Sequence, residues 1–194
     1  MESGKIENII QVITVGNISP VKGYSRLIEV ASIVSRKTEL QIQFTIVGRI
    51  WDSQKSHFKE LMGMISQLGL SNITIIPGSD NIPQLLANAD VYFCCSTSES
   101  SPIAVFEAMS MSLPVVATNV GDLKAIVDAN NCGFVSNVED INGLADSILR
   151  LANNSSLRAQ QGLQSRQISS QLFSDEIITN HHRKTYQQVL NASI

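Results

Sequence analysis

The sequence has little charge, few aromatic residues and few cysteines. Only 16% of its 194 residues are charged, and 14 Lys and Arg against 17 Asp and Glu give a formal net charge of -3. A nucleic-acid-binding domain carries a clustered excess of basic residues that neutralises phosphates, so this composition argues against one. Hydrophobic residues still make up 43% of the chain, which is typical of a folded domain and not of a disordered one.

Long hydrophobic runs are also missing. The first residues, Met1 to Lys5, lack the apolar segment of a signal peptide, and no run approaches the ~18 apolar residues that cross a membrane. We therefore expect a cytoplasmic location and no membrane span. The length suits one domain, because domains typically comprise about 100–200 residues.

Metal-ligating residues do not cluster in the sequence. Cys94, Cys95 and Cys132 show neither a C-x-x-C pair nor zinc-site spacing, so we expect small core residues in a reducing compartment. The adjacent histidines at 181–182 would point in different directions on a helix, and we expect them and His57 to be solvated. No D-x-D pair is present to chelate a metal-nucleotide, so no metal cofactor is expected.

Short runs rich in Val, Ile and Thr alternate with segments of helical periodicity, which predicts repeated strand-helix units. The expected strands are 12–15, 42–47, 73–76, 91–94, 115–117 and 133–135. The expected helices include 27–34, 54–68, 83–88, 102–111, 123–129 and 141–151. Crossovers of this length are nearly always right-handed, so we expect a Rossmann-like α/β fold, a doubly wound parallel sheet of about six strands.

The pattern changes after residue 152. Two polar helical stretches, 156–170 and 174–190, follow, with no further strand. We expect one domain, 1–194, in which 1–152 is the strand-helix core and 153–194 adds helices packed against the outside of the sheet. Ligands bind at the carboxyl ends of strands in such sheets, so functional residues should follow the strands.

A turn-rich loop, Gly16 to Gly23, follows the first expected strand and places Lys22 near its end. Glycine permits close approach of the backbone to a ligand, and lysine supplies a mobile positive charge; together they suit a diphosphate. This loop alone does not establish a phosphate site, because such turns are common and a loop lysine is usually only solvated.

The fourth expected strand leads into a loop and a helix that carry two glutamates. Ser101 suits an N-cap and Pro102 a first helical position, so the free N–H groups of Ile103 and the next residue would form an anion site. Glu99 precedes this helix, and Glu107 lies about 7.5 Å from its start along the axis. Carboxylates in such places accept hydrogen bonds from sugar hydroxyls. The alternative for Glu107 is a solvated helix face, against which its apolar neighbours argue.

The segment from Glu99 to Thr118 resembles the E-x7-E signature of retaining glycosyltransferases of family 4, the group 1 glycosyltransferases. The resemblance extends over nearly the whole chain, through 15–16, 22–23, 44–48, 68–70, 75–78, 87–92, 120–121, 173–174 and Tyr186. Each piece is degenerate, but their order and spacing together are specific.

The resemblance implies the carboxyl-terminal, donor-binding half of a GT-B fold, with an N-terminal acceptor domain that this chain lacks. Such enzymes transfer a hexose-type sugar from a nucleotide-diphosphate sugar, such as a UDP- or GDP-sugar, with retention of configuration and without a metal. It also implies a role in surface polysaccharide or glycoconjugate synthesis. We expect the isolated chain to be inactive, and any membrane-associated acceptor to be reached through the missing half.

The same resemblance assigns roles to matching positions. Glu99 would hold hydroxyls of the donor sugar and Glu107 the ribose, while Lys22 would stabilise the diphosphate as the glycosidic bond breaks. Glu99 and Lys22 are thus the expected catalytic residues, and the loop at 78–79 would meet the base. The expected nucleotide-sugar-binding residues are Gly16, Asn17, Lys22, Gly78, Ser79, Glu99, Ser100, Ser101, Pro102, Ile103 and Glu107.

Three positions depart from the family pattern. Asn17 stands where an arginine is usual, which removes one positive charge; Arg49, at the end of the second expected strand, is a candidate substitute. Ser112 replaces a glycine, at a cost of about 1 kcal/mol if the residue is left-handed. Ala125 stands where a glutamate is common, so donor binding would be weaker or altered.

Two other functions remain open at this point. The chain would be a non-catalytic binding or assembly domain of the same fold if Asn17 marks a decayed diphosphate site. It would alternatively be part of a sugar-nucleotide epimerase, because fold does not fix function.

Overall fold

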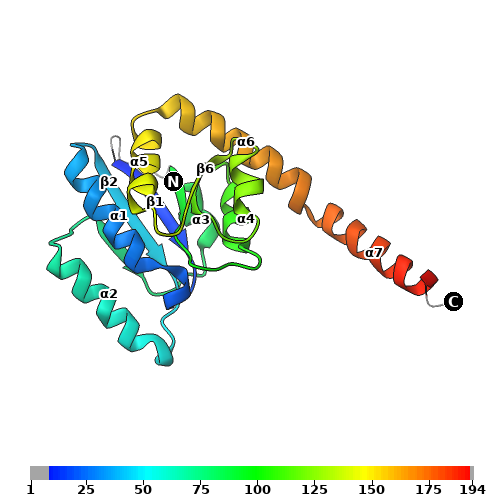
Figure 1. Cartoon of the computed structure of the whole chain (residues 1–194), viewed down its shortest axis with the longest axis horizontal. Helices are drawn as coiled ribbons and strands as arrows, with labels where there is room; N and C mark the ends of the chain where they lie inside the picture. The colour runs from blue at the N-terminus through cyan, green and yellow to red at the C-terminus, as the bar shows by residue number, and fades with distance from the viewer. Residues whose placement is uncertain (1–8, 193–194) are drawn as a thin grey trace.

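The computed structural model describes residues 9–192, which are built around one six-stranded parallel sheet (Figure 1). The strand order is β3-β2-β1-β4-β5-β6, so the order reverses between β1 and β4. The strands are β1 (Ile9–Val15), β2 (Gln41–Val47), β3 (Ile73–Ile76), β4 (Val91–Cys94), β5 (Val115–Thr118) and β6 (Gly133–Ser136). This confirms the doubly wound α/β fold, including its six parallel strands.

Helices connect the strands. The α-helices are α1 (Tyr24–Lys37), α2 (Lys55–Gln67), α3 (Ile82–Ala87), α4 (Ile103–Ser110), α5 (Ile141–Ala152), α6 (Ser155–Phe173) and α7 (Asp175–Ala192). Two 3-10 turns, η1 (Pro20–Lys22) and η2 (Asp52–Gln54), precede α1 and α2. The helix expected at 123–129 is a single π-helical segment, η3 (Lys124–Asp128), and not an α-helix.

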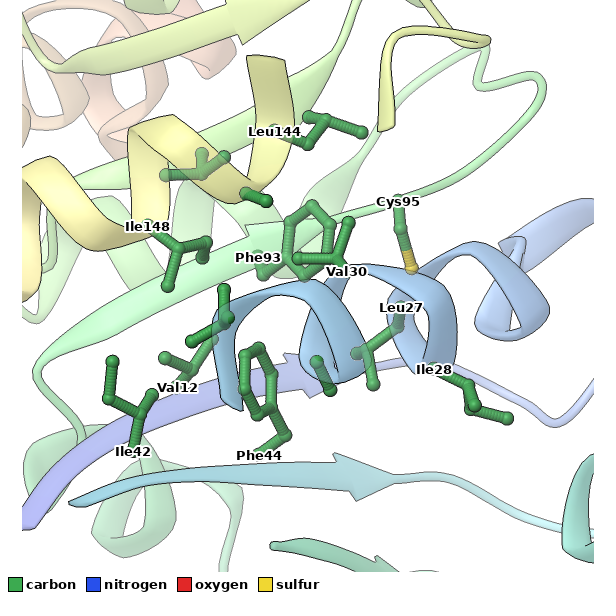
Figure 2. Close-up of a cluster of buried hydrophobic side chains, with 14 of the residues drawn as sticks. Val12, Leu27, Ile28, Val30, Ile42, Phe44, Phe93, Cys95, Leu144 and Ile148 are labelled. Atoms are coloured by element: carbon green, nitrogen blue, oxygen red, sulfur yellow. The ribbon is translucent and has the colours of Figure 1, made fainter. Parts of the chain in front are cut away.

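Two hydrophobic clusters lie on opposite faces of the sheet, because side chains alternate along each strand. Val12 belongs to one cluster and Ile13 to the other. Figure 2 shows the first cluster, in which Phe44 and Phe93 lie beneath α1 and α5. Leu27, Ile28, Ala31 and Val34 form the buried stripe that α1 lays on this face, as its helical spacing predicts.

The two carboxyl-terminal helices behave differently. α6 packs against α4 and β6, and Gly162 lies against the main chain at Ser112, where a Cβ would come within 2.2 Å of the carbonyl oxygen. Ser112 itself has a φ of 62°, which is the left-handed conformation considered above. No residue of α7 from 175 to 191 is buried, and the helix extends away from the sheet (Figure 1). The prediction that the whole tail packs against the sheet is therefore wrong for α7, whose polar sequence offers no wide apolar stripe.

The burial of the cysteines and of His57 tests what was predicted for them. All three cysteines are buried and free, as predicted. The prediction for His57 is wrong: its Nε2 is buried without a partner, and its Nδ1 lies 3.5 Å from Glu60 Oε2. The reason is helical spacing, because His57 shares a face of α2 with the buried Leu61 and Ile65.

Within residues 9–192, no helix is both long and apolar enough to cross a membrane.

Candidate nucleotide-sugar site

A cleft of about 340 Å³ opens at the carboxyl edge of the sheet, where the strand order reverses. The ends of β1 and β4 form its floor, with Thr14, Tyr92 and Cys94 among the lining residues. Burial raises the pKa of Tyr92 well above its usual value, so this phenol stays neutral. The expected site residues that line this cleft are Gly16, Asn17, Lys22, Glu99, Ser101, Pro102, Ile103 and Glu107.

The loop after β1 is held close to the end of β2. The N–H of Gly16 donates to the carbonyl of Val47, and the N–H of Ile18 donates to the carbonyl of Arg49, each at 2.9 Å. Position 48 must be glycine for this approach, because a Cβ on Gly48 would lie 1.8 Å from the carbonyl oxygen of Gly16. The loop that carries two expected donor-binding residues is therefore a rigid extension of the sheet.

The same loop then turns sharply into α1. Gly23 ends the η1 turn with a φ of 66°, and a Cβ there would lie 2.0 Å from the carbonyl oxygen of Cys95. The buried Tyr24 hydroxyl donates to the carbonyl of Gly16 at 2.7 Å and ties the two ends of the loop together. Burial raises the pKa of Tyr24 well above its usual value, so this bond persists through neutral pH. Lys22 is thereby fixed at the rim of the cleft.

The two expected catalytic residues contact each other, although they lie 77 positions apart in the chain. Lys22 Nζ donates to Glu99 Oε1 at 2.7 Å, and Ser96 Oγ donates to the same oxygen at 2.7 Å. The Lys22 and Glu99 side chains are 28% and 11% exposed, so solvent screens this ion pair less than a surface pair. Both bonds use Oε1, which leaves Oε2 available to accept a hydrogen bond from a ligand hydroxyl.

Ser96 and Thr118 were not anticipated as site residues. Ser96 is 3% exposed, and its carbonyl accepts a 2.6 Å hydrogen bond from the hydroxyl of Thr118, at the end of β5. The Thr118 hydroxyl also lies 3.3 Å from the carbonyl of Cys94. The sequence signal was a hydroxyl residue at or just beyond the end of each of two buried strands: Thr118 ends β5, and Ser96 lies two residues beyond β4. These residues support the Glu99 loop from the neighbouring strand.

α4 begins at Ile103, one residue later than expected. Pro102 is the N-cap, with φ -80° and ψ 70°, and this inverse γ-turn brings the N–H of Ile103 to the carbonyl of Ser101 at 2.9 Å. The predictions that Ser101 caps the helix by its side chain and that the Ile103 N–H is free are therefore wrong. The N–H of Val105 donates to the Pro102 carbonyl, and among residues 9–192 the Ala104 N–H has no acceptor. Ala104 lines the cleft, so a partly positive helix start still faces it.

Glu107 and Ser100 differ in their relation to the cleft. Glu107 lies on the first turns of α4, and its side chain is exposed but lines the cleft. Ser100 is exposed and lines neither this cleft nor the pocket beside it. The structure therefore brings Glu107 to the cleft together with Glu99, whereas Ser100 lines neither of the two cavities.

A second pocket, of about 140 Å³, adjoins the cleft beside the ends of β2 and β3. Gly78 and Ser79, the residues expected to meet a base, line this pocket together with Arg49. Val15, Gly16 and Asn17 line both cavities, so the two lie side by side. Gly78 has a φ of 89°, which requires glycine and sets the course of the loop after β3.

Within the described part of the chain, no group of three or more His, Cys, Asp or Glu side chains is arranged to hold a metal ion. The residues that line the cleft offer a ligand three kinds of contact: carboxylates at Glu99 and Glu107, an ammonium at Lys22, and main-chain N–H groups. Together they suit a ligand that has both hydroxyl and anionic groups.

The chain also matches a known protein family. The family model described as "Glycosyl transferases group 1" matches residues 2–168. The chain is 26% identical over 191 residues to N-acetyl-alpha-D-glucosaminyl L-malate synthase of Bacillus anthracis, covering 97% of this chain and 48% of that enzyme. It is 32% identical over 170 residues to poly(ribitol-phosphate) alpha-N-acetylglucosaminyltransferase of Staphylococcus aureus, covering 84% and 33% respectively. The chain thus spans about half or less of the length of these relatives.

Solved structures agree with the family match. Anabaena Alr3699/HepE, in complex with UDP and glucose, superposes with a TM-score of 0.85 at 26% identity, over 93% of this chain and 48% of that protein. The C-terminal domain of a group 1 glycosyltransferase, LpcC from Francisella tularensis, has the same fold, with a TM-score of 0.76 at 23% identity over 86% and 87% of the two chains. The solved structures thus agree in fold, and the family model confirms the expected family: the chain belongs to the group 1 glycosyltransferases.

Proposed function

We propose that this chain is the donor-binding domain of a retaining glycosyltransferase, and that its carboxyl-edge cleft holds a nucleotide-diphosphate sugar. The observation that carries the proposal is the Lys22–Glu99 pair beside the start of α4, in a cleft that Glu107 also lines. Two carboxylates suited to hydroxyls and one cation suited to phosphate thus lie in one cavity, as a sugar nucleotide requires.

In this proposal each group of the donor has a partner. The free Oε2 of Glu99 accepts from hydroxyls of the transferred sugar, and Glu107 accepts from the ribose. The diphosphate lies between the Lys22 ammonium and the Ala104 N–H at the start of α4. The base occupies the smaller pocket, beside Gly78.

Lys22 then contributes to the chemistry through the leaving group. Negative charge grows on the diphosphate as the glycosidic bond breaks, and a fixed cation lowers the energy of that state. An ammonium has three N–H donors, so Lys22 can keep Glu99 as one acceptor while it donates to the diphosphate. Glu99 in turn holds both the sugar and the lysine, which couples their positions.

The lengths of the relatives support a proposal about the domains. We propose that residues 1–194 form a single donor domain and that a separate N-terminal half binds the acceptor, which makes the isolated chain inactive. The relative that modifies poly(ribitol-phosphate) supports a role in surface polysaccharide or glycoconjugate synthesis, with any membrane-associated acceptor bound by the other half. The cytoplasmic location stays a prediction.

Calorimetric titration of the chain with UDP- and GDP-sugars, in buffer containing EDTA, tests the proposal. We expect metal-independent binding that Lys22→Ala and Glu107→Ala weaken at least ~10-fold, because each removes a charge-assisted contact. Lys59→Ala and Glu39→Ala remove the same charges from exposed positions outside the cleft and should leave binding unchanged.

Two results contradict the proposal. Binding that is unchanged in both cleft variants removes the site assignment. A folded chain that binds no nucleotide favours the non-catalytic domain instead. Sugar-nucleotide epimerisation would be recognised by its product, because an epimerase returns an altered donor and transfers no sugar.

A further inference from the structure

The cleft proposed for the donor carries the wrong formal charge for its ligand. Its charged lining residues are one lysine and two glutamates, Lys22, Glu99 and Glu107, which leaves an excess of one negative charge. The Lys22 ammonium is already paired with Glu99 at 2.7 Å. The start of α4 adds only about half a positive charge. The diphosphate of a nucleotide sugar carries two negative charges, and that of UDP more, so the cleft needs a further cation within reach.

Arg49 is the cation that lines the adjoining pocket. It lies two residues beyond the end of β2, and its carbonyl accepts a 2.9 Å hydrogen bond from the N–H of Ile18 in the loop that carries Asn17. Arg49 and Asn17 line the same 140 Å³ pocket, and Asn17 also lines the main cleft. The Arg49 side chain thus lines the smaller pocket beside Gly78, and Asn17 lies on the side of that pocket that adjoins the cleft.

The guanidinium of Arg49 is available for a ligand. Among residues 9–192, no carboxylate forms an ion pair with it and no acceptor binds it, and its side chain is exposed. Arg26, another cation near this edge, is by contrast occupied: it donates to the Cys95 carbonyl and lies 3.8 Å from Glu139. A guanidinium presents a planar fork of donors that matches two phosphate oxygens at once.

We propose that Arg49 is a diphosphate-binding residue of this chain and supplies the positive charge that the loop at Asn17 does not. The inference rests on the proposed function, because it assumes a nucleotide-diphosphate ligand in the cleft. It adds a residue from a different loop: the anion is held between the ends of β1 and β2 as well as by Lys22 and α4. With Arg49 included, the charged residues that line the two adjoining cavities are two cations and two carboxylates, so the negative excess is cancelled.

Calorimetric titration with UDP tests this assignment. Arg49→Gln should weaken UDP binding at least ~10-fold, since a bidentate, charge-assisted contact is lost. Arg49→Lys should retain part of the affinity, because it keeps the charge and loses the fork. Arg36→Gln, the same change on an exposed residue of α1, is the matched control and should bind UDP as the unaltered chain does.

A charge-relocation variant identifies which part of the nucleotide Arg49 contacts. Adding Asn17→Arg to Arg49→Gln puts a guanidinium at a position that lines both cavities, and it should recover most of the lost UDP affinity. Loss of affinity in Arg49→Gln without such recovery would place Arg49 on the base and overturn the diphosphate assignment. Unchanged binding in Arg49→Gln would refute the inference and leave the proposed function intact, whereas no UDP binding by the unaltered chain would refute both.

Discussion

The ion pair between Lys22 and Glu99 gives the sharpest energetic prediction. The two atoms are 2.7 Å apart, and the side chains are 28% and 11% exposed. Fully exposed pairs contribute about 0.2–1 kcal/mol, whereas hydrogen bonds to charged groups contribute about 1.5–3 kcal/mol. Partial screening by solvent places this pair between these ranges. We expect a coupling of about 1–2 kcal/mol between Lys22→Met and Glu99→Gln in a double-mutant cycle.

The single variants should differ in a defined order. Lys22→Met leaves a carboxylate that is largely buried and is held only by Ser96, while Glu99→Gln leaves an ammonium that is more open to water. Lys22→Met should therefore be the more destabilising change, because the less solvated charge loses its partner. Urea unfolding of the four proteins, monitored by circular dichroism, gives the free energies of unfolding.

A second pair in the same chain serves as the control. Lys37 and Asp146 lie 2.8 Å apart, but their side chains are 44% and 64% exposed. Their coupling should be about 0.5 kcal/mol or less. A Lys22–Glu99 coupling within about 0.3 kcal/mol of zero, or one no larger than that of the exposed pair, would refute the reasoning from burial.

Three further changes test the backbone and the buried phenols. Ser112→Gly should raise the free energy of unfolding by about 0.5–1 kcal/mol, because relief of the left-handed strain exceeds the added freedom of the unfolded chain; a lower denaturation midpoint would contradict this. Gly48→Ala should lower the free energy of unfolding by about 2 kcal/mol or more, since its Cβ would meet the Gly16 carbonyl. Gly63→Ala, in open space on α2, is the control and should be neutral or stabilising when both variants are compared by thermal melts. Burial raises the pKa of Tyr24 above that of the unfolded chain, so the unfolded state loses this proton first and stability falls as pH rises above about 10. Tyr24→Phe should make that alkaline fall shallower by about 1.4 kcal/mol per pH unit, and an unchanged slope would place the titration elsewhere.

Most of the fold could be predicted because its sequence patterns are local. The alternation that sends Val12 and Ile13 to opposite faces, and the helical spacing after Leu27, each act within one element. Strand ends were correct to within three residues for this reason. The exposed position of α7 was missed because both tail helices were expected to pack alike, although α7 lacks a wide apolar stripe.

The site was predictable in its members but not in its contacts. Glu99, Glu107 and Lys22 were identified from their positions after the expected strands, and the resemblance assigned their roles; the topology brings all three to one cleft. The support of Glu99 by Ser96 and Thr118 depends on the pairing of β4 with β5, which no single segment encodes. The γ-turn at Pro102 was missed because a proline after a serine equally suits a helix start.

The central claim, that the carboxyl-edge cleft binds a nucleotide diphosphate, is tested most directly by nuclear magnetic resonance. A nitrogen-15 labelled chain titrated with UDP should show its largest amide shifts at Gly16 and Ala104, on the two sides of the cleft. These shifts should saturate together with the calorimetric binding curve. Shifts centred instead on the opposite edge of the sheet, around Ser71 and Asn72, or no shifts at all, would contradict the account.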